Sequence, residues 1–367
     1  MKTTHKILFG DATELRDVES GSVALVVTSP PYPMIEMWDA TFSRRDPAVA
    51  RALEEGEGAA AFERMHRLLD RAWAELHRVL MPGGLACINV GDAPRTIDGR
   101  FGLYANHARV LARCVEIGFT ALPAIIWRKQ TNAPNKFMGS GTLPAGAYVT
   151  LEHEFVLILR KGDTRRFTTA AAKRTRAESA LFWEERNAWY SDVWFDLKGA
   201  AQRLGHGDAR RRSGAFPFEL AYRLINMFSV RGDTVLDPFL GTGTTTLAAM
   251  AAARNSIGVE IDPALKETIL EVTTKDAVAI SNDRIRERIA SHLAFVTDRR
   301  RAKGKDAFKY VNSTYGFPVM TKPETKILLN ALDGVEIAPE GTLQVSYLDA
   351  QVAAKARKSS FLRSEGP

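Results

Sequence analysis

The chain has 367 residues, a net charge of +7 and a pI near 9.4, a basic balance that is common among proteins that bind polyanions. Hydrophobic residues make up 45% and charged residues 25%, which excludes a mainly disordered chain and suits one large domain with insertions, or two domains. The two cysteines, Cys87 and Cys114, exclude a disulfide framework, and we expect no metal site.

The N-terminal residues lead directly into a short strand, without the apolar stretch of a signal peptide. No segment approaches about eighteen consecutive apolar residues, so we expect no membrane span and a cytoplasmic location. Strands and helices then alternate. We expect strands at 6–11, 23–28, 85–90, 121–127, 155–160, 234–239 and 256–261, and helices at 61–80, 107–117, 216–228 and 244–253. This alternation predicts an α/β, Rossmann-like fold, in which a mostly parallel twisted sheet carries helices on both faces.

Several stretches interrupt the alternation. Residues 33–60 and 130–150 are expected to be long loops, and loops of this length are often functional. In the first of them, Arg45 could contact DNA or simply lie at the surface. Residues 280–308 are expected to form a basic helix, for which a structural role and a DNA-backbone role are equally open.

The segment 161–215 is polar, irregular and basic. Thirteen Arg and Lys stand against seven Asp and Glu in 160–215, so most of the net charge lies there. Four large aromatic residues lie among these charges: Trp183, Trp189, Tyr190 and Trp194. A solvated charged face would not need them, so we interpret the segment as a nucleic-acid-binding surface.

A glycine-rich turn follows the expected strand at 234–239. Asp237, Pro238 and Phe239 precede Gly241, Gly243 and Thr244. A phosphate-binding P-loop would need Lys where Thr244 stands, and a nicotinamide-binding turn would need a third glycine at position 246, which is Thr. S-adenosylmethionine fits better, because Asp237 suits its cationic groups and Glu260, which ends the next strand, can accept its ribose hydroxyls. A capping turn with incidental glycines is the alternative.

A rigid turn, Ser29-Pro30-Pro31-Tyr32, directly follows the strand at 23–28. Consecutive prolines fix the backbone, and the carboxyl end of a buried strand in an open α/β sheet is where ligands bind. Ser29 Oγ and the Pro30 carbonyl could accept hydrogen bonds from an amino group on a nucleobase and free its lone pair. A base that has left the duplex could stack on Tyr32. A rigid surface turn is the alternative.

Together these segments resemble the exocyclic-amino DNA methyltransferases, and their order is similar to the beta group of that family. Three other segments also resemble parts of the family. Phe9-Gly10-Asp11 resembles its adenine-contacting segment, and Phe216-Pro217-Phe218 resembles its cofactor-binding segment. Leu80-Met81-Pro82-Gly83-Gly84 resembles its helix-ending turn. The resemblance implies catalytic roles for Ser29, Pro30, Pro31 and Tyr32, and S-adenosylmethionine binding by Asp11, Phe216, Pro217, Asp237, Pro238, Phe239, Gly241, Gly243, Thr244 and Glu260.

The resemblance also implies a domain organisation. The catalytic domain would comprise 1–160 and 216–265, with 161–215 as an inserted target-recognition region and 266–367 as a C-terminal extension of unknown role. Ser29, where many relatives carry Asp, is similar to the cytosine-N4 branch, so we expect N4 methylation of cytosine in double-stranded DNA, after base flipping and by direct transfer. Adenine-N6 methylation is the main alternative.

More distant alternatives are a methyltransferase acting on RNA or on a protein amide, and a non-catalytic DNA-binding module on the same fold. Cytosine-C5 methylation is excluded because neither cysteine follows a proline. A cognate restriction endonuclease is an expected partner, and the enzyme would act as a monomer or homodimer. Glu152-His153-Glu154, which leads into a strand, is interpreted as structural rather than catalytic.

Overall fold

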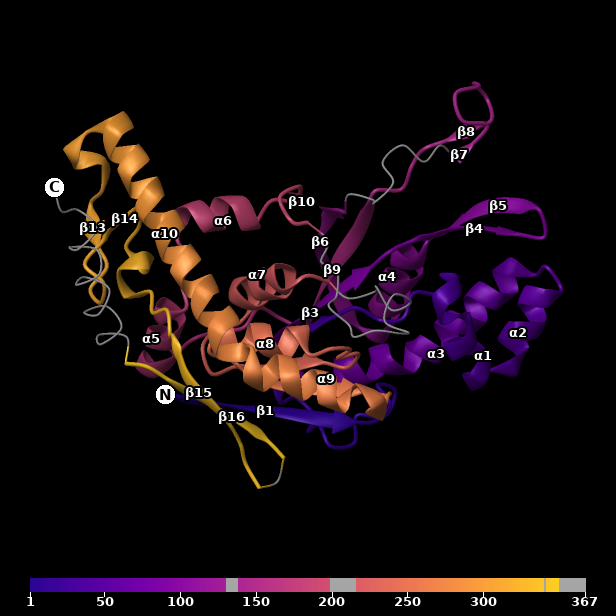
Figure 1. The fold of residues 1–367 in the computed structure, drawn as a ribbon, viewed down its shortest axis with the longest axis horizontal. Coiled ribbons are helices and arrows are strands. Elements are labelled where there is room, and N and C mark those ends of the chain that lie inside the picture. Colours follow the sequence, from indigo (N-terminus) through magenta and orange to yellow (C-terminus); the bar gives the residue numbers. More distant parts are fainter. Residues whose placement is uncertain (130–137, 199–215, 340, 350–367) are drawn as a thin grey trace.

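A ten-stranded mixed sheet forms the centre of the computed structural model, which describes residues 1–129, 138–198, 216–339 and 341–349 (Figure 1). The strand order is β10-β6-β9-β3-β2-β11-β12-β1-β16-β15. Its strands are β1 (Lys2–Phe9), β2 (Val23–Thr28), β3 (Leu80–Val90), β6 (Phe119–Arg128), β9 (His153–Lys161), β10 (Val193–Trp194), β11 (Thr234–Asp237), β12 (Asn255–Glu260), β15 (Leu332–Ile337) and β16 (Leu343–Tyr347).

The central strands run parallel. β3, β2, β11, β12 and β1 form one continuous parallel block. β9 pairs antiparallel with β3 on one side, and β16 pairs antiparallel with β1 on the other. The predicted fold class is therefore confirmed, and all seven expected strands are present within a few residues of their predicted bounds.

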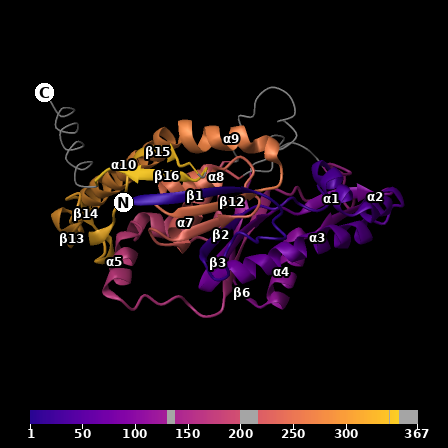
Figure 2. The ribbon, with the colours of Figure 1, turned by 90° about the horizontal axis from the view of Figure 1, so that it is seen from below.

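Helices cover both faces of the sheet (Figure 2). They are α3 (Gly58–Val79), α4 (Asn106–Ile117), α7 (Phe218–Phe228), α8 (Thr244–Ala251), α9 (Lys266–Leu270) and α10 (Ala277–Lys303). The alternation of side chains along β9 divides the core: Leu157 and Leu159 pack with α3 and α4, whereas Val156 and Ile158 pack with α7 and α8. Because these strands are buried on both faces of the sheet, their sequences are continuous apolar runs.

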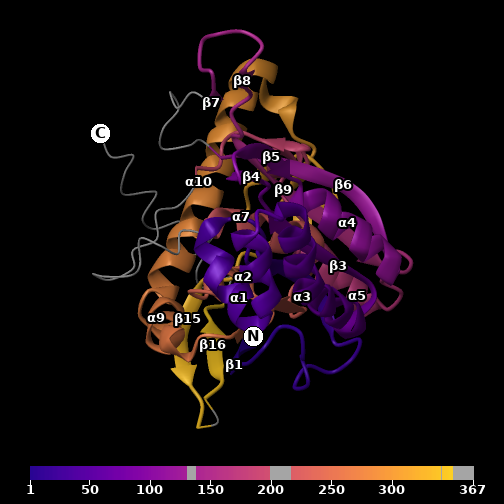
Figure 3. The same cartoon turned by 90° about the vertical axis from the view of Figure 1, so that its right-hand side faces the viewer.

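The prediction that residues 33–60 form a loop is wrong. The segment contains α1 (Asp39–Arg45), α2 (Pro47–Glu54) and the start of α3, which lie together at one end of the molecule and face the viewer in Figure 3. Asp46 caps α2, because its carboxylate accepts a hydrogen bond from the Ala48 backbone amide and Pro47 occupies the first helical position. Both helices are short: α1 buries Phe42, and α2 buries Val49 and Ala52.

Two hairpins project beyond the sheet. β4 (Ala93–Ile97) pairs with β5 (Arg100–Tyr104), and β7 (Met138–Gly139) pairs with β8 (Ala147–Tyr148). Of the loop expected at 130–150, residues 130–137 lie outside the described residues, and the remainder contains the second hairpin.

The C-terminal region is part of the same architecture. α10 packs on α8, and β16 extends the sheet beyond β1 with Thr3 opposite Val345. The predicted basic helix at 280–308 is confirmed as α10, which ends at Lys303. A small sheet of β13 (Tyr310–Val311) and β14 (Pro318–Val319) lies beyond it. No helix in the described ranges is long and apolar enough to cross a membrane.

Candidate active site

The two predicted motifs lie side by side at one edge of the sheet. β2 and β11 are parallel neighbours, with Leu25 opposite Val235 and Val26 opposite Leu236. Their carboxyl ends therefore meet, and each end carries one of the motifs: Ser29-Pro30-Pro31-Tyr32 after β2, and the glycine turn after β11. Ligands of open α/β sheets bind at this edge.

Asp237 joins the two motifs. Thr28, the last residue of β2, donates a 2.6 Å hydrogen bond to Asp237 Oδ1, and Thr245 in the first turn of α8 donates a 2.6 Å bond to Oδ2. The Phe239 backbone amide also donates to Oδ1, at 3.1 Å. Burial raises the pKa of Asp237 to about 6, although these hydrogen bonds oppose the shift. The carboxylate thus holds β2, the glycine turn and α8 in one arrangement.

The glycine turn needs glycine at two positions. Gly241 and Gly243 have φ angles of +56° and +92°, in the left-handed region that side chains other than glycine rarely adopt. A Cβ atom on Gly243 would also lie 3.2 Å from Thr273 Cγ2. At Gly241, by contrast, no heavy atom of the described residues lies within 4 Å of the Cβ position, so this side of the turn is open. Pro238 is buried and Thr244 begins α8.

Glu260 closes the turn from the neighbouring strand. Its Oε2 accepts a 2.8 Å hydrogen bond from the Gly241 amide, and its Oε1 accepts a 2.9 Å bond from the Asp262 amide. Burial raises the pKa of this carboxyl group. A carboxylate has about four lone-pair sites and the protein supplies three backbone donors, so Glu260 can still accept from a ligand hydroxyl. The open glycine turn and this acceptor fit the nucleoside part of S-adenosylmethionine.

Asp11 lies near the same edge, just after β1, whose last residue Phe9 is opposite Glu260. Its carboxylate accepts a 2.9 Å bond from the Thr13 amide and forms a 2.6 Å ion pair with Arg45. Although burial opposes the change, these contacts lower the pKa of Asp11. The sequence left Arg45 open as a DNA contact or a surface residue, and its ion pair ties α1 to this edge.

Phe216 and Pro217 begin the described part of the chain that follows 199–215. Phe216 is buried in the core beneath α7, and Pro217 is the N-cap residue of α7. Both are therefore fixed at the start of a helix that packs against β2.

The Ser29-Pro30-Pro31-Tyr32 corner contains a hydrogen-bond network. The Ser29 and Tyr32 hydroxyls lie 2.8 Å apart. Tyr32 donates a 3.1 Å bond to Glu154 Oε2, and Asn89 Nδ2 donates to the Tyr32 hydroxyl at 2.8 Å and to Glu154 Oε2 at 2.6 Å. Lys129 Nζ forms a 2.8 Å ion pair with Glu154 Oε1. Burial, and next the negative charge of Glu154, raise the pKa of Tyr32 well above its usual value.

Two members of this network, Asn89 and Lys129, were missed from the sequence, and a third, Glu154, was interpreted as structural. Asn89 lies near the end of β3, at the same edge as Ser29, and that position was a usable signal. Glu154 comes to this edge because β9 runs antiparallel to β3 and β6, so its beginning lies where the parallel strands end. Lys129 follows β6 directly. Among the described residues, no group of three or more His, Cys, Asp or Glu could hold a metal ion.

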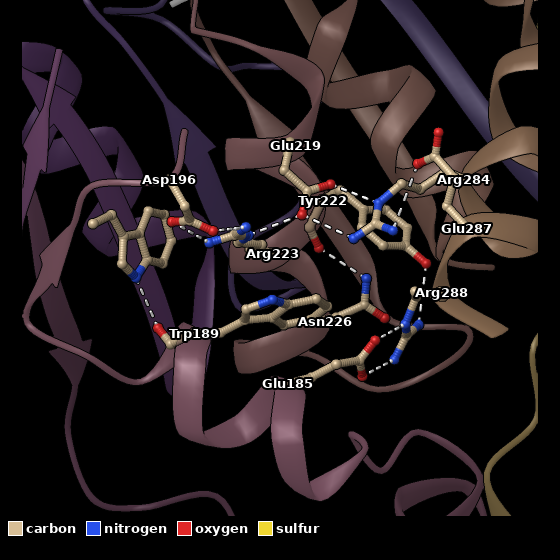
Figure 4. A network of polar contacts seen from close by, with 11 residues as sticks. Glu185, Trp189, Asp196, Glu219, Tyr222, Arg223, Asn226, Arg284, Glu287 and Arg288 are labelled. Carbon is tan, nitrogen blue, oxygen red and sulfur yellow. Dashed lines mark hydrogen bonds and ion pairs between the residues drawn. The ribbon is translucent and has the colours of Figure 1, made fainter. Parts of the chain in front are cut away.

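The aromatic residues of 161–215 do not form one exposed surface. The prediction is wrong for Trp189 and Trp194, whose exposed fractions are 4% and 1%. Their rings pack around Arg223 in a buried network between α6 (Trp183–Trp189), α7 and α10 (Figure 4). Trp183 and Tyr190 remain partly exposed, at 37% and 44%. The network's ion pairs hold α6 and α7 against α10, and a separate 2.8 Å ion pair between Glu178 and Arg231 holds α5 (Ala170–Glu178). Residues 199–215 lie outside the described residues.

A mixed sheet with a parallel centre, an open glycine turn and an acidic side chain at the end of the next strand define a methyltransferase of Rossmann-like fold. A family model with the description DNA methylase matches residues 23–271. The chain therefore belongs to the DNA methylase family, whose members transfer methyl groups to exocyclic N6 or N4 amino groups.

Individual relatives agree with this assignment. The type II methyltransferase M.MthZI of Methanothermobacter thermautotrophicus is 48% identical over 330 residues, which cover 90% of this chain and 91% of the relative. M.MjaI of Methanocaldococcus jannaschii is 49% identical over 280 residues, which cover 73% of this chain and 91% of that one. A Thermus thermophilus structure in complex with S-adenosyl-L-methionine matches with a TM-score of 0.58 and 33% identity, over 74% of this chain and 94% of that chain. The protein is an S-adenosylmethionine-dependent DNA methyltransferase.

Proposed function

We propose that the enzyme methylates the N4 amino group of cytosine at a specific site in duplex DNA, with the target base flipped into the Ser29-Pro30-Pro31-Tyr32 corner. The observation that carries the proposal is the direct link between this corner and the glycine turn through Thr28, Asp237 and Thr245. A base amine held at Ser29 would then lie beside the methyl donor, since both motifs occupy adjacent strand ends.

The chain's own residues would activate the amine. The lone pair of an exocyclic amine is conjugated with the ring and is a poor nucleophile. Ser29 Oγ and the Pro30 carbonyl would accept the two amine hydrogens and draw the nitrogen toward tetrahedral geometry, which frees the lone pair. Pro30 and Pro31 hold these acceptors rigidly. S-adenosylmethionine supplies an electrophilic methyl group, and no covalent bond to the enzyme is needed.

Cofactor binding would be divided between direct and indirect contacts. Glu260 would accept the ribose hydroxyls, and the open side of Gly241 would admit the nucleoside. Asp11, Phe216 and Pro217 would line the remainder. Because the Asp237 oxygens already accept three donors within the protein, we infer that Asp237 acts on the cofactor by holding the glycine turn. Pro238, Phe239, Gly243 and Thr244 would shape that turn.

The assignment to cytosine rests on Ser29 and its similarity to the cytosine-N4 branch. Adenine-N6 methylation needs the same activation and is the second candidate. We further propose that 161–215 contributes to target recognition, in which the partly exposed Trp183 and Tyr190 could still take part. The curated relatives are type II methyltransferases, so we propose a cognate restriction endonuclease as partner.

Expression in a host without DNA methylation tests the proposal. Sequencing of the host DNA with modification detection should show N4-methylcytosine at one recurring sequence. Methylated adenine at one site would transfer the assignment to the second candidate. Unmodified DNA, together with methyl transfer to RNA or protein by the purified enzyme, would refute a DNA substrate.

A further inference from the structure

Five side chains from separate segments form one continuous chain of hydrogen bonds at the catalytic corner. Ser29 and Tyr32 follow β2, and Lys129 follows β6. Asn89 is the residue before the last of β3, and Glu154 is the second residue of β9. The Glu154 side chain is only 12% exposed. The chain of contacts runs from the predicted amine-binding hydroxyl to a carboxylate more than a hundred residues away in sequence.

Counting protons fixes the direction of each hydrogen bond. The Tyr32 hydroxyl has one proton, which it donates to Glu154 Oε2 at 3.1 Å. Its oxygen must then accept from its other two neighbours, and Asn89 Nδ2 donates to it at 2.8 Å. Ser29, 2.8 Å from the same oxygen, is therefore also a donor to Tyr32. Both lone pairs of Ser29 Oγ are left free to accept hydrogen bonds from a base amine.

The orientation of Asn89 supports this direction. Its amide nitrogen donates to both Tyr32 and Glu154, while its Oδ1 is buried without a hydrogen-bond partner in the part of the chain that the structure describes. A buried acceptor without a partner costs about 1–3 kcal/mol. The opposite orientation would set Oδ1 against the Glu154 carboxylate, so the negative charge of Glu154 determines which way Asn89 faces.

We propose that Glu154 is the final proton acceptor of a hydroxyl relay, in which Ser29 and Tyr32 carry away the proton that the target amine must lose. The proposal rests on the function proposed above. As the nitrogen lone pair forms its bond to the methyl carbon, the carbon–sulfur bond breaks and its electron pair remains on sulfur, so nitrogen becomes positively charged. One N–H proton then passes to Ser29 Oγ, the Ser29 proton to the Tyr32 oxygen, and the Tyr32 proton to Glu154 Oε2.

The surroundings of Tyr32 and Glu154 suit these residues to their roles in the relay. Tyr32 has a raised pKa, so it holds a proton strongly and passes one on as it receives another, without remaining ionised. Lys129 neutralises Glu154 before the transfer and keeps Oε1 occupied, which directs the proton to Oε2. The slight exposure of Glu154 then allows the proton to leave for solvent between turnovers.

Single-turnover methylation of duplex DNA by the full-length enzyme tests the relay. Glu154→Gln keeps the size of the side chain and an oxygen acceptor for Tyr32 but removes the base. We expect the methylation rate to fall about 100-fold or more, with the Kd values for S-adenosylmethionine and for DNA little changed. Tyr32→Phe keeps the ring and should lose a similar factor, and the double variant should be no slower than the slower single variant, because each change breaks the same relay.

The matched control is Glu152→Gln, two residues away. Glu152 pairs at 3.2 Å with Arg128, and the side chains are 31% and 47% exposed. Loss of a partly exposed ion pair contributes little, so this variant should stay within about twofold of the wild-type rate.

A measurement without cofactor tests the hydrogen bond from Tyr32 to Glu154 on which the relay depends. Tyrosines labelled with ¹³C at Cζ give one resonance for Tyr32, identified by its loss in Tyr32→Phe. This resonance should shift in Glu154→Gln and stay unchanged in Glu152→Gln, because only the first change replaces the acceptor of the Tyr32 proton.

Two results would overturn the relay: a Glu154→Gln rate within about threefold of wild type, well short of the loss that removal of a general base causes, or an unmoved Tyr32 resonance. The Tyr32→Phe rate decides the matter if Glu154→Gln fails to fold. A product other than N4-methylcytosine would refute the proposed substrate but not the relay. The ratio of the variant rate to the wild-type rate on the actual substrate would still decide the relay.

Discussion

Two buried polar networks in this enzyme differ in their composition. The network between α6, α7 and α10 pairs Arg223, Arg284 and Arg288 with Asp196, Glu219 and Glu185, and Tyr222 accepts one further bond (Figure 4). The network at the catalytic corner has a single ion pair and two hydroxyl groups in series.

The two networks differ in whether their hydrogen bonds can reverse direction. Guanidinium groups only donate and carboxylates only accept, so the ion pairs of the first network have one arrangement of protons, and they hold helices together. Hydroxyl groups both donate and accept, so the second network can shift its protons from one end to the other. Polar burial at the helices therefore stabilises the fold, whereas at the corner we propose that it prepares chemistry.

Breaking the helix network should have the largest effect on stability. Arg288→Met leaves the Glu185 carboxylate buried without its bidentate partner, whose contact to Oε2 measures 2.7 Å. We expect a loss of about 3–5 kcal/mol in the free energy of unfolding. Urea denaturation measures it, and Glu185→Leu combined with Arg288→Met should recover much of the loss. A single variant as stable as the wild type would contradict the proposed role of this network.

Asp237 gives a prediction that depends on pH. Its folded pKa of about 6 lies above the ordinary value of 3.8, so the folded state binds this proton more tightly. The resulting stabilisation is fully present below about pH 4 and is lost as the pH rises through about 6. At about 1.4 kcal/mol per pKa unit, the stability of the wild type relative to Asp237→Asn should fall by about 2 kcal/mol between about pH 4 and pH 7. A difference that does not change with pH would show that burial does not perturb this group.

The smallest predicted effect on stability concerns an exposed ion pair on α10. Arg286 contacts Asp283, and their side chains are 60% and 59% exposed. Arg286→Ala should change the free energy of unfolding by less than about 1 kcal/mol, because water and salt screen exposed pairs. Thermal denaturation of this variant and of Arg288→Met, a change on the same helix, compares the two losses of stability directly. An equally large loss in both variants would mean that burial is not what distinguishes them.

Much of the fold and both motifs could be predicted from the sequence, since their signals are local. Apolar runs marked the strands, and the prolines and glycines marked the turns at their ends. The helix α2 was missed although Asp46-Pro47 is a recognisable helix start, because the segment buries only Val49 and Ala52. The strands β15 and β16 were missed because they complete the sheet from its far edge.

Lys129 and Glu154 could not be assigned to the network from the sequence, because their partners lie far away in the chain. Glu154 ends the polar run that precedes the apolar part of β9, and this pattern is the same whether Glu154 faces solvent or the Ser29-Pro30-Pro31-Tyr32 corner. Only the antiparallel direction of β9 decides which. Trp189 and Trp194 read as surface aromatics because charged residues surround them, yet those charges include the partners that bury them. Arg223 lies between the two rings and pairs with Asp196 at 2.6 Å.

The most direct test of the site compares cofactor binding and methyl transfer in two variants. Ser29→Ala should bind S-adenosylmethionine with nearly the wild-type affinity in calorimetry but lose methylation of duplex DNA, because only the acceptor for the amine is removed. Asp237→Ala should lose cofactor binding itself, since the glycine turn is no longer held against β2. Undiminished methylation by Ser29→Ala would contradict the account, for it would place the chemistry away from this corner.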